Sequence, residues 1–130
     1  MANASAIAVT DLVANGAAAR PVGDVLDTGT GTVTLSAPVA GESDRVVLEV
    51  TNTQGAAALQ VAVKAGANPP AFRAGLGDYV PSALAAGATA LYGPFESARF
   101  VGAGGALQVA FTPASGTIGA TIRCYRLPKA

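Results

Sequence analysis

The sequence of 130 residues contains no histidine, no tryptophan and a single cysteine, Cys124. Without histidine, the chain lacks the side chain that most often acts as a general base and most often binds a transition metal. One cysteine can form neither an internal disulfide nor a zinc site built from cysteines. These absences exclude hydrolases with a histidine-containing triad. We therefore expect no bound metal, no cofactor and no catalytic residue that depends on histidine.

Charged residues are also scarce. They make up 12% of the chain, and eight Lys and Arg balance eight Asp and Glu, so the formal net charge is zero. Such a chain has no basic surface to attract nucleic acid or an acidic membrane. No apolar run approaches the 18 or so residues of a membrane-spanning helix. We therefore expect neither nucleic acid nor a membrane as a partner.

The hydrophobic content of 51% consists largely of small side chains. The chain holds 30 alanines and 16 glycines. Because burying an alanine removes little apolar area from water, the core must be thin and closely packed. A surface of small neutral residues is poorly protected against association, which suits a protein that functions in contact with partners.

Alternating apolar and polar residues separated by turn signals predict short strands. The clearest alternation occurs in four segments, at 46–51, 59–64, 107–112 and 118–125, and weaker alternation occurs at 7–13, 32–36, 89–92 and 98–101. Turn residues at 52–55 and 113–116 separate the four clear segments into two pairs, for which we predict two antiparallel hairpins.

About eight short strands predict an all-β fold, which we expect to be a single-domain antiparallel β-sandwich of the jelly-roll type. Glycine and proline interrupt the alanine-rich stretches, so only one helical turn is expected, at 82–86. Residues 14–31 and 65–88 are expected to be long loops. We expect residues 1–20 to form an N-terminal arm, and residues 21–130 to form the sandwich.

One motif indicates a possible reaction. Asp27-Thr28-Gly29 follows two apolar residues, as in the active-site signature of retroviral-type aspartic proteases. In those enzymes two aspartates from a dimer share one proton, and one carboxylate serves as the base. The alternative is a polar turn that leads into the next strand, because aspartate and glycine are common in turns.

Other residues are candidates for contacts with partners. Phe72 and Tyr79 flank a predicted loop and either contact a partner or cover the ends of the core. Arg99, Arg123 and Arg126 are expected to lie close together, where they bind a carboxylate-bearing partner or form internal ion pairs. Cys124 is expected to be a buried structural thiol.

Several segments resemble the decoration, or cement, proteins encoded in the head gene clusters of tailed bacteriophages. The resemblance is carried by residues 68–75, 93–100 and 125–128, and in style by residues 46–50 and 59–64. It implies a β-sandwich or jelly-roll domain, present as a homotrimer at three-fold points on the outside of a capsid. The function implied is a structural virion protein, assembled in the cytoplasm of the bacterial host, that binds the major capsid protein and stabilises its lattice. Within such a protein we expect the N-terminal arm to contact a neighbouring subunit or the capsid protein. We expect further partner contacts at Phe72, Arg73, Tyr79, Arg99 and Arg126.

Two other functions are compatible with the sequence. The first is a carbohydrate-binding or adhesion module of a virion, such as the base of a head fibre. The second is an aspartic protease that acts through Asp27 in a homodimer.

Overall fold

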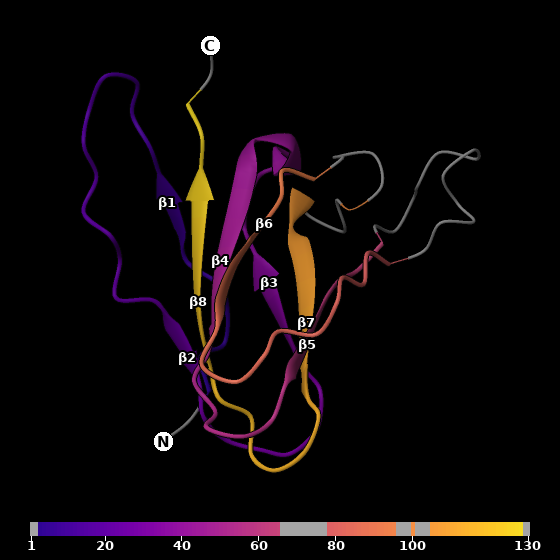
Figure 1. Ribbon diagram of the computed structural model, residues 1–130. Coiled ribbons are helices and arrows are strands. Elements are labelled where there is room, and N and C mark those ends of the chain that lie inside the picture. The colour runs from indigo at the N-terminus through magenta and orange to yellow at the C-terminus, as the bar shows by residue number, and fades with distance from the viewer. Residues whose placement is uncertain (1–2, 66–77, 96–99, 101–104, 129–130) are drawn as a thin grey trace.

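The computed structural model describes residues 3–65, 78–95, 100 and 105–128, which form two facing β-sheets (Figure 1). The five-stranded sheet has the order β1-β8-β4-β6, with β2 pairing the same edge of β8 as β1 does. The three-stranded sheet has the order β3-β7-β5. The strands are β1 (Val9–Asp11), β2 (Asp24–Leu26), β3 (Val33–Ala37), β4 (Val46–Asn52), β5 (Leu59–Val63), β6 (Thr89–Tyr92), β7 (Leu107–Pro113) and β8 (Ala120–Arg126).

The all-β sandwich predicted from the alternation is confirmed. In β4, apolar residues at every second position are buried and the residues between them are half-buried. The same alternation in β5 and β8 directs their apolar side chains between the sheets, because successive side chains of a strand point to opposite faces. The centre of the core consists of fully buried residues from both sheets, namely Leu26, Leu35, Leu48, Val50, Leu59, Val61, Val109, Phe111 and Ile122.

The two predicted hairpins are wrong. β4 pairs with β8 and β6, whereas β5 pairs with β7, so the segment 53–58 crosses from one sheet to the other. The segment 114–119 crosses between the sheets in the same way, from β7 to β8. Each connection is six residues long, which is enough to cover the end of the sandwich. Alternation predicted which residues are buried, but it carries no information on which strand is the neighbour.

Similar connections lie side by side at one end of the sandwich (Figure 1). The segment 27–32 joins β2 to β3, and the Ile118 amide donates to the Gly29 carbonyl (2.8 Å). On the other side of 114–119, the Thr53 amide donates to the Gly119 carbonyl (3.0 Å) and the Ala114 amide to the Ala58 carbonyl (2.9 Å). Strands that are neighbours in one sheet are therefore connected to strands that are neighbours in the other.

Asn52, at the end of β4, is one of only two buried polar residues in the described part of the chain. Its side-chain nitrogen donates to the carbonyls of Ala57 (2.8 Å) and Leu84 (3.1 Å). Its side-chain oxygen accepts from the Gln54 amide (3.0 Å). The segment at Leu84 is not the predicted helical turn, because Leu84 exchanges two backbone hydrogen bonds with Leu59 on the edge of β5.

The first residues of the expected N-terminal arm belong to the sandwich. Ile7 is fully buried, and its amide donates to the Ser36 carbonyl (3.0 Å). β1 lies within the strand that the weak alternation at 7–13 predicts, and it pairs with β8 in parallel. The fold therefore has no boundary at residue 20. β2 was missed within the predicted loop 14–31 because its three residues are too few to show a period. The predicted strand at 98–101 lies outside the described residues, apart from Phe100.

Replacing Asn52 with Ala is expected to lower the free energy of unfolding by about 2–4 kcal/mol, because two buried carbonyls and one amide would lose their partner. Urea unfolding followed by circular dichroism measures this change. Thr51→Ala, on the outward side of the same strand, is the matched control; it removes one exposed hydroxyl contact with Thr89 (2.9 Å) and should change stability by about 1 kcal/mol or less. Equal effects of the two substitutions would contradict the role assigned to Asn52.

Candidate functional site

The outer face of the five-stranded sheet carries an open groove of about 520 Å³. Most of its lining is apolar, although a carboxylate, a guanidinium group and a phenol also contribute. The lining residues come from the segment after β1, from β4, β6 and β8, and from the chain after β8; they are Leu12, Arg20, Val47, Glu49, Leu91, Tyr125 and Leu127.

Strand register brings the residues of the groove floor together. Val47 lies opposite Tyr125 in the β4–β8 pair, and Glu49 lies opposite Leu91 in the β4–β6 pair. All four residues have outward-facing parity. Val47 and Glu49 alternate with buried residues of β4, Tyr125 follows the buried Cys124, and Leu91 precedes the buried Tyr92. Leu91 is 67% exposed and Leu127 is 39% exposed, so apolar side chains face solvent at the rim.

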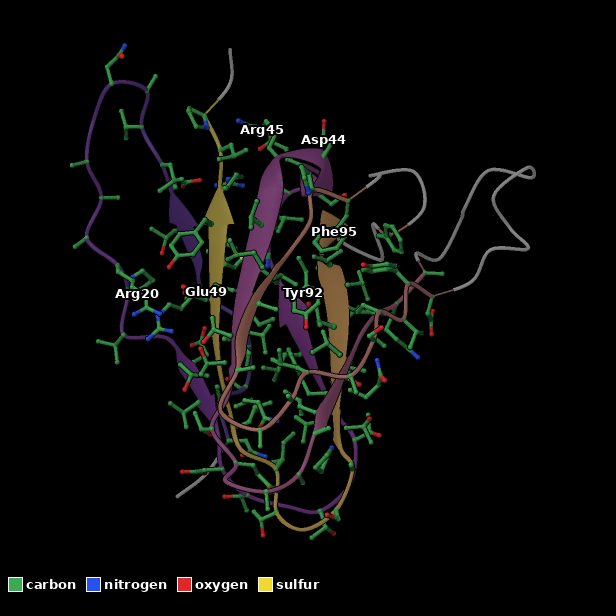
Figure 2. All side chains as sticks on the ribbon, in the orientation of Figure 1. Arg20, Asp44, Arg45, Glu49, Tyr92 and Phe95 are labelled. Carbon is green, nitrogen blue, oxygen red and sulfur yellow. The ribbon has the colours of Figure 1, made fainter. Side chains whose placement is uncertain are left out.

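Glu49 is the polar centre of the groove. The Arg20 guanidinium donates to one carboxylate oxygen at 2.9 Å and lies 3.4 Å from the other. The Tyr125 hydroxyl donates to Glu49 at 2.8 Å. Figure 2 shows Arg20 reaching from the segment between β1 and β2 toward Glu49 on β4. The carboxylate therefore has hydrogen-bond donors from two separate segments of the chain.

The segment between β1 and β2 loops out beside the five-stranded sheet (Figure 1). Its Leu12 and Arg20 line the groove, and most of its other residues are exposed. Arg123 on β8 holds its second half, donating to the carbonyls of Pro21 (2.7 Å) and Val22 (2.9 Å). Gly23 follows with a φ of +99°, and a Cβ at this position would lie 2.6 Å from the Thr121 methyl group. Both the backbone conformation and the close approach to β8 therefore require glycine here.

The hydrogen bonds of the groove change the acidity of its side chains. Arg20, and next Tyr125, stabilise the charged form of Glu49 and lower the pKa of this carboxyl. Partial burial, and next the bond to Glu49, raises the pKa of Tyr125. At neutral pH Glu49 is thus ionised and engaged by donors, which suits it poorly for general base catalysis. An apolar groove around a neutralised ion pair is suited to binding.

Tyr79 and Arg126, two of the predicted contact residues, lie on different sheets. The backbone of Tyr79 pairs with Val63 at the edge of β5, and its side chain is 40% exposed. The Arg126 guanidinium binds Asp11 through two hydrogen bonds (2.5 and 3.0 Å) and also contacts Glu42 (3.5 Å). Phe72, Arg73 and Arg99 lie outside the described residues.

Arg123 and Arg126 lie on opposite faces of β8 and bind different segments. Arg123 has the outward parity of β8 and binds the segment before β2. Arg126 has the inward parity at the end of the strand, where it joins β1 to the connection after β3 through Asp11 and the Val39 carbonyl. Two roles were predicted for these arginines, a contact with a partner and an internal ion pair; Arg126 forms an internal ion pair.

Asp27 lies in a turn after β2. The Asn3 side chain accepts hydrogen bonds from the amides of Asp27 (2.8 Å) and Thr28 (2.9 Å) and donates to the Thr28 carbonyl (2.8 Å). The Asp27 carboxylate accepts from the Thr28 hydroxyl (3.1 Å). These contacts give the motif a local structural role, as the turn interpretation predicts.

Cys124 is fully buried, as predicted from its alternation. Burial raises the pKa of its thiol to about 12, so the thiol stays protonated and unreactive at neutral pH. Among the described residues, no three acidic or cysteine side chains cluster in a way that could hold a metal ion. In the same part of the chain, no helix is long and apolar enough to span a membrane.

No motif in the sequence points to the groove. Its signal was present in the outward positions of the strands, where Val47, Leu91 and Tyr125 stand at positions that a solvated sheet face usually fills with polar residues. The contribution of Arg20 could not be predicted, because it depends on how the segment between β1 and β2 returns to the sheet. Comparisons of the chain with family models, with curated proteins and with solved structures found no match.

Replacing Arg20 with Ala is expected to raise the pKa of Glu49, and Tyr125→Phe should raise it less, because Arg20 is the larger cause of the lowered value. Carboxyl chemical shifts followed by NMR during an acid titration measure both changes. Lys64→Ala is the control, since Lys64 pairs with Asp78 and should leave Glu49 unchanged.

The same cluster predicts the pH dependence of stability. Because folding lowers the pKa of Glu49, its contribution to stability is present above the unfolded pKa and is lost as the pH falls through the folded value. The stability difference between wild type and Arg20→Ala should therefore vanish in acid. A difference that persists after Glu49 is protonated would mean that Arg20 acts through packing instead.

Proposed function

We propose that this protein is a structural virion protein, a decoration or cement protein that binds the outside of a bacteriophage capsid. In this proposal it binds the major capsid protein as a homotrimer at three-fold points and has no catalytic activity. Its binding stabilises the mature shell by mass action, because a ligand that binds one state of a lattice favours that state. Repetition of the contact over the shell adds avidity.

The observation that carries the proposal is the outward face of the five-stranded sheet. It presents an apolar groove whose one ion pair, Arg20–Glu49, is neutral overall. An apolar groove with a few convergent polar groups is the usual form of a binding site. The chain has zero net charge, so neighbouring copies on a shell would not repel one another.

The order of the strands also supports the proposal. Neighbours β2, β8, β4 and β6 in one sheet are joined to β3, β7, β5 and the segment 79–84 in the other. This arrangement is the one expected of a jelly roll, in which a long antiparallel ribbon folds over itself to form two sheets. Jelly rolls are common in viral capsid proteins and in lectins.

The lectin alternative leads to a binding function of a different class, in which the groove would hold a sugar. Tyr125 is the aromatic side chain that lines the groove, and its hydroxyl is already bonded to Glu49. A sugar would have to stack on a ring held by this bond. We therefore favour a protein partner, and retain the carbohydrate-binding or adhesion module and the Asp27 protease as alternatives.

The test uses expanded shells of the phage whose genome encodes this chain, mixed with the purified protein and imaged by electron cryomicroscopy. We expect added density on the outer surface at three-fold points and a higher temperature of shell disruption. Absence of binding to these shells would overturn the proposed function.

A variant of the groove tests the surface itself. Leu127→Asp places a charge at the apolar rim and is expected to reduce shell occupancy at least tenfold. Thr34→Asp, exposed on the other sheet, is the matched control and should bind as wild type does. If Leu127→Asp retains full occupancy, the groove is not the contact surface.

A further inference from the structure

Strand β6 forms the edge of the five-stranded sheet opposite β1 and β2. It pairs with β4 in antiparallel register, with Val50 opposite Ala90. Other outer strands bond to further segments of the chain. β2 accepts a hydrogen bond from the Ala4 amide, β3 accepts one from the Ile7 amide, and β5 exchanges two with Leu84. Within the described ranges, no such segment pairs with the outer edge of β6.

The direction of the backbone groups of β6 follows from the hydrogen bonds of β4. The Asn52 amide donates to the Ala88 carbonyl, whereas the Thr53 amide donates to Gly119 beyond β8. Hydrogen-bonded pairs recur at every second residue of an antiparallel ladder. Ala90 therefore directs its amide and carbonyl toward β4, and Thr89 and Leu91 direct theirs toward the open edge.

This edge is short, but it lacks the charges and proline that normally prevent strands from adding to a sheet. The residues of β6 are Thr89, Ala90, Leu91 and Tyr92, which include no charged residue and no proline. Natural edge strands are commonly protected by lysine, proline or a bulge within the strand. Leu91 adds an apolar side chain that is 67% exposed on the groove face.

We propose that β6 pairs antiparallel with β6 of a second copy of this chain, about a two-fold axis at Ala90. In this register Thr89 of each copy lies opposite Leu91 of the other, and both pairs are of the hydrogen-bonded type. Four backbone hydrogen bonds then join two five-stranded sheets into one continuous sheet.

A second copy is the occupant because the register is self-complementary. The residues whose backbone groups face outward, Thr89 and Leu91, are spaced symmetrically about Ala90, as an isologous contact requires. Charge does not oppose the contact. Glu49, the carboxylate opposite Leu91, is neutralised in each copy by Arg20. The pairing places the two apolar grooves next to each other on one face.

This contact does not rest on the proposed function. A two-fold axis at β6 can coexist with a three-fold axis elsewhere on the surface, where it would link neighbouring trimers. The experiment below uses the isolated full chain and no shell, so its failure is distinguishable from a failure to bind capsids.

The first measurement is sedimentation equilibrium of the wild-type chain from micromolar to submillimolar concentration. We expect an association with an even number of chains, and for Leu91→Lys a dissociation constant at least tenfold higher. Thr34→Lys, on the exposed side of β3, is the matched control and should associate as wild type does. A monomer at all concentrations, or a trimer alone, would overturn the proposal.

The second measurement tests the register and does not depend on how well the lysine variant folds. Ala90 lies opposite its own copy in a pair without hydrogen bonds, where the Cα atoms approach within the range of a disulfide. With oxidised glutathione, Ala90→Cys should form a covalent dimer at least tenfold faster than Thr34→Cys. Wild-type Cys124 is buried and should form none. Equal rates for the two variants would show that β6 does not pair in this register.

Discussion

The hydrogen bonds of the Asn52 side chain join segments that the backbone ladders alone would leave separate. β4 belongs to one sheet, and the Ala57 and Leu84 carbonyls lie where the chain enters or borders the other. A buried amide that loses such partners costs free energy, so the residue specifies one geometry for the crossing. The neighbouring connection 114–119 packs against this crossing, and 27–32 packs against 114–119 in turn.

The groove is a consequence of this order. Placing β8 between β4 and the pair β1 and β2 puts Tyr125 next to Val47 and brings the segment between β1 and β2 beside the outer face. Arg123 and Arg20 then attach that segment to the sheet, one through carbonyls and the other through Glu49. The carboxylate that would otherwise make the face acidic is neutralised, which leaves an apolar surface suited to contact with protein.

Association is a property of the whole surface as well as of the groove. The small neutral residues that make the core thin also leave few charges on the edges of the sheets, and β6 has none. A surface of this composition is poorly protected against association. The two proposed contacts share Leu91 but use different groups of it: the shell contact uses its side chain in the groove, and the β6 contact uses the backbone of its strand.

Alternation in the sequence was sufficient to predict the all-β class, the burial of Cys124 and the location of most strands, because the period of two depends only on local geometry. The sequence also contains the apolar residues of the groove, such as Leu91, at outward-facing strand positions. The partner of each strand was decided by tertiary structure, since an apolar face packs equally well after a hairpin or after a crossing between sheets. The same reason applies to Arg20 and Arg126, because their partners lie 29 and 115 residues away and no local pattern relates them.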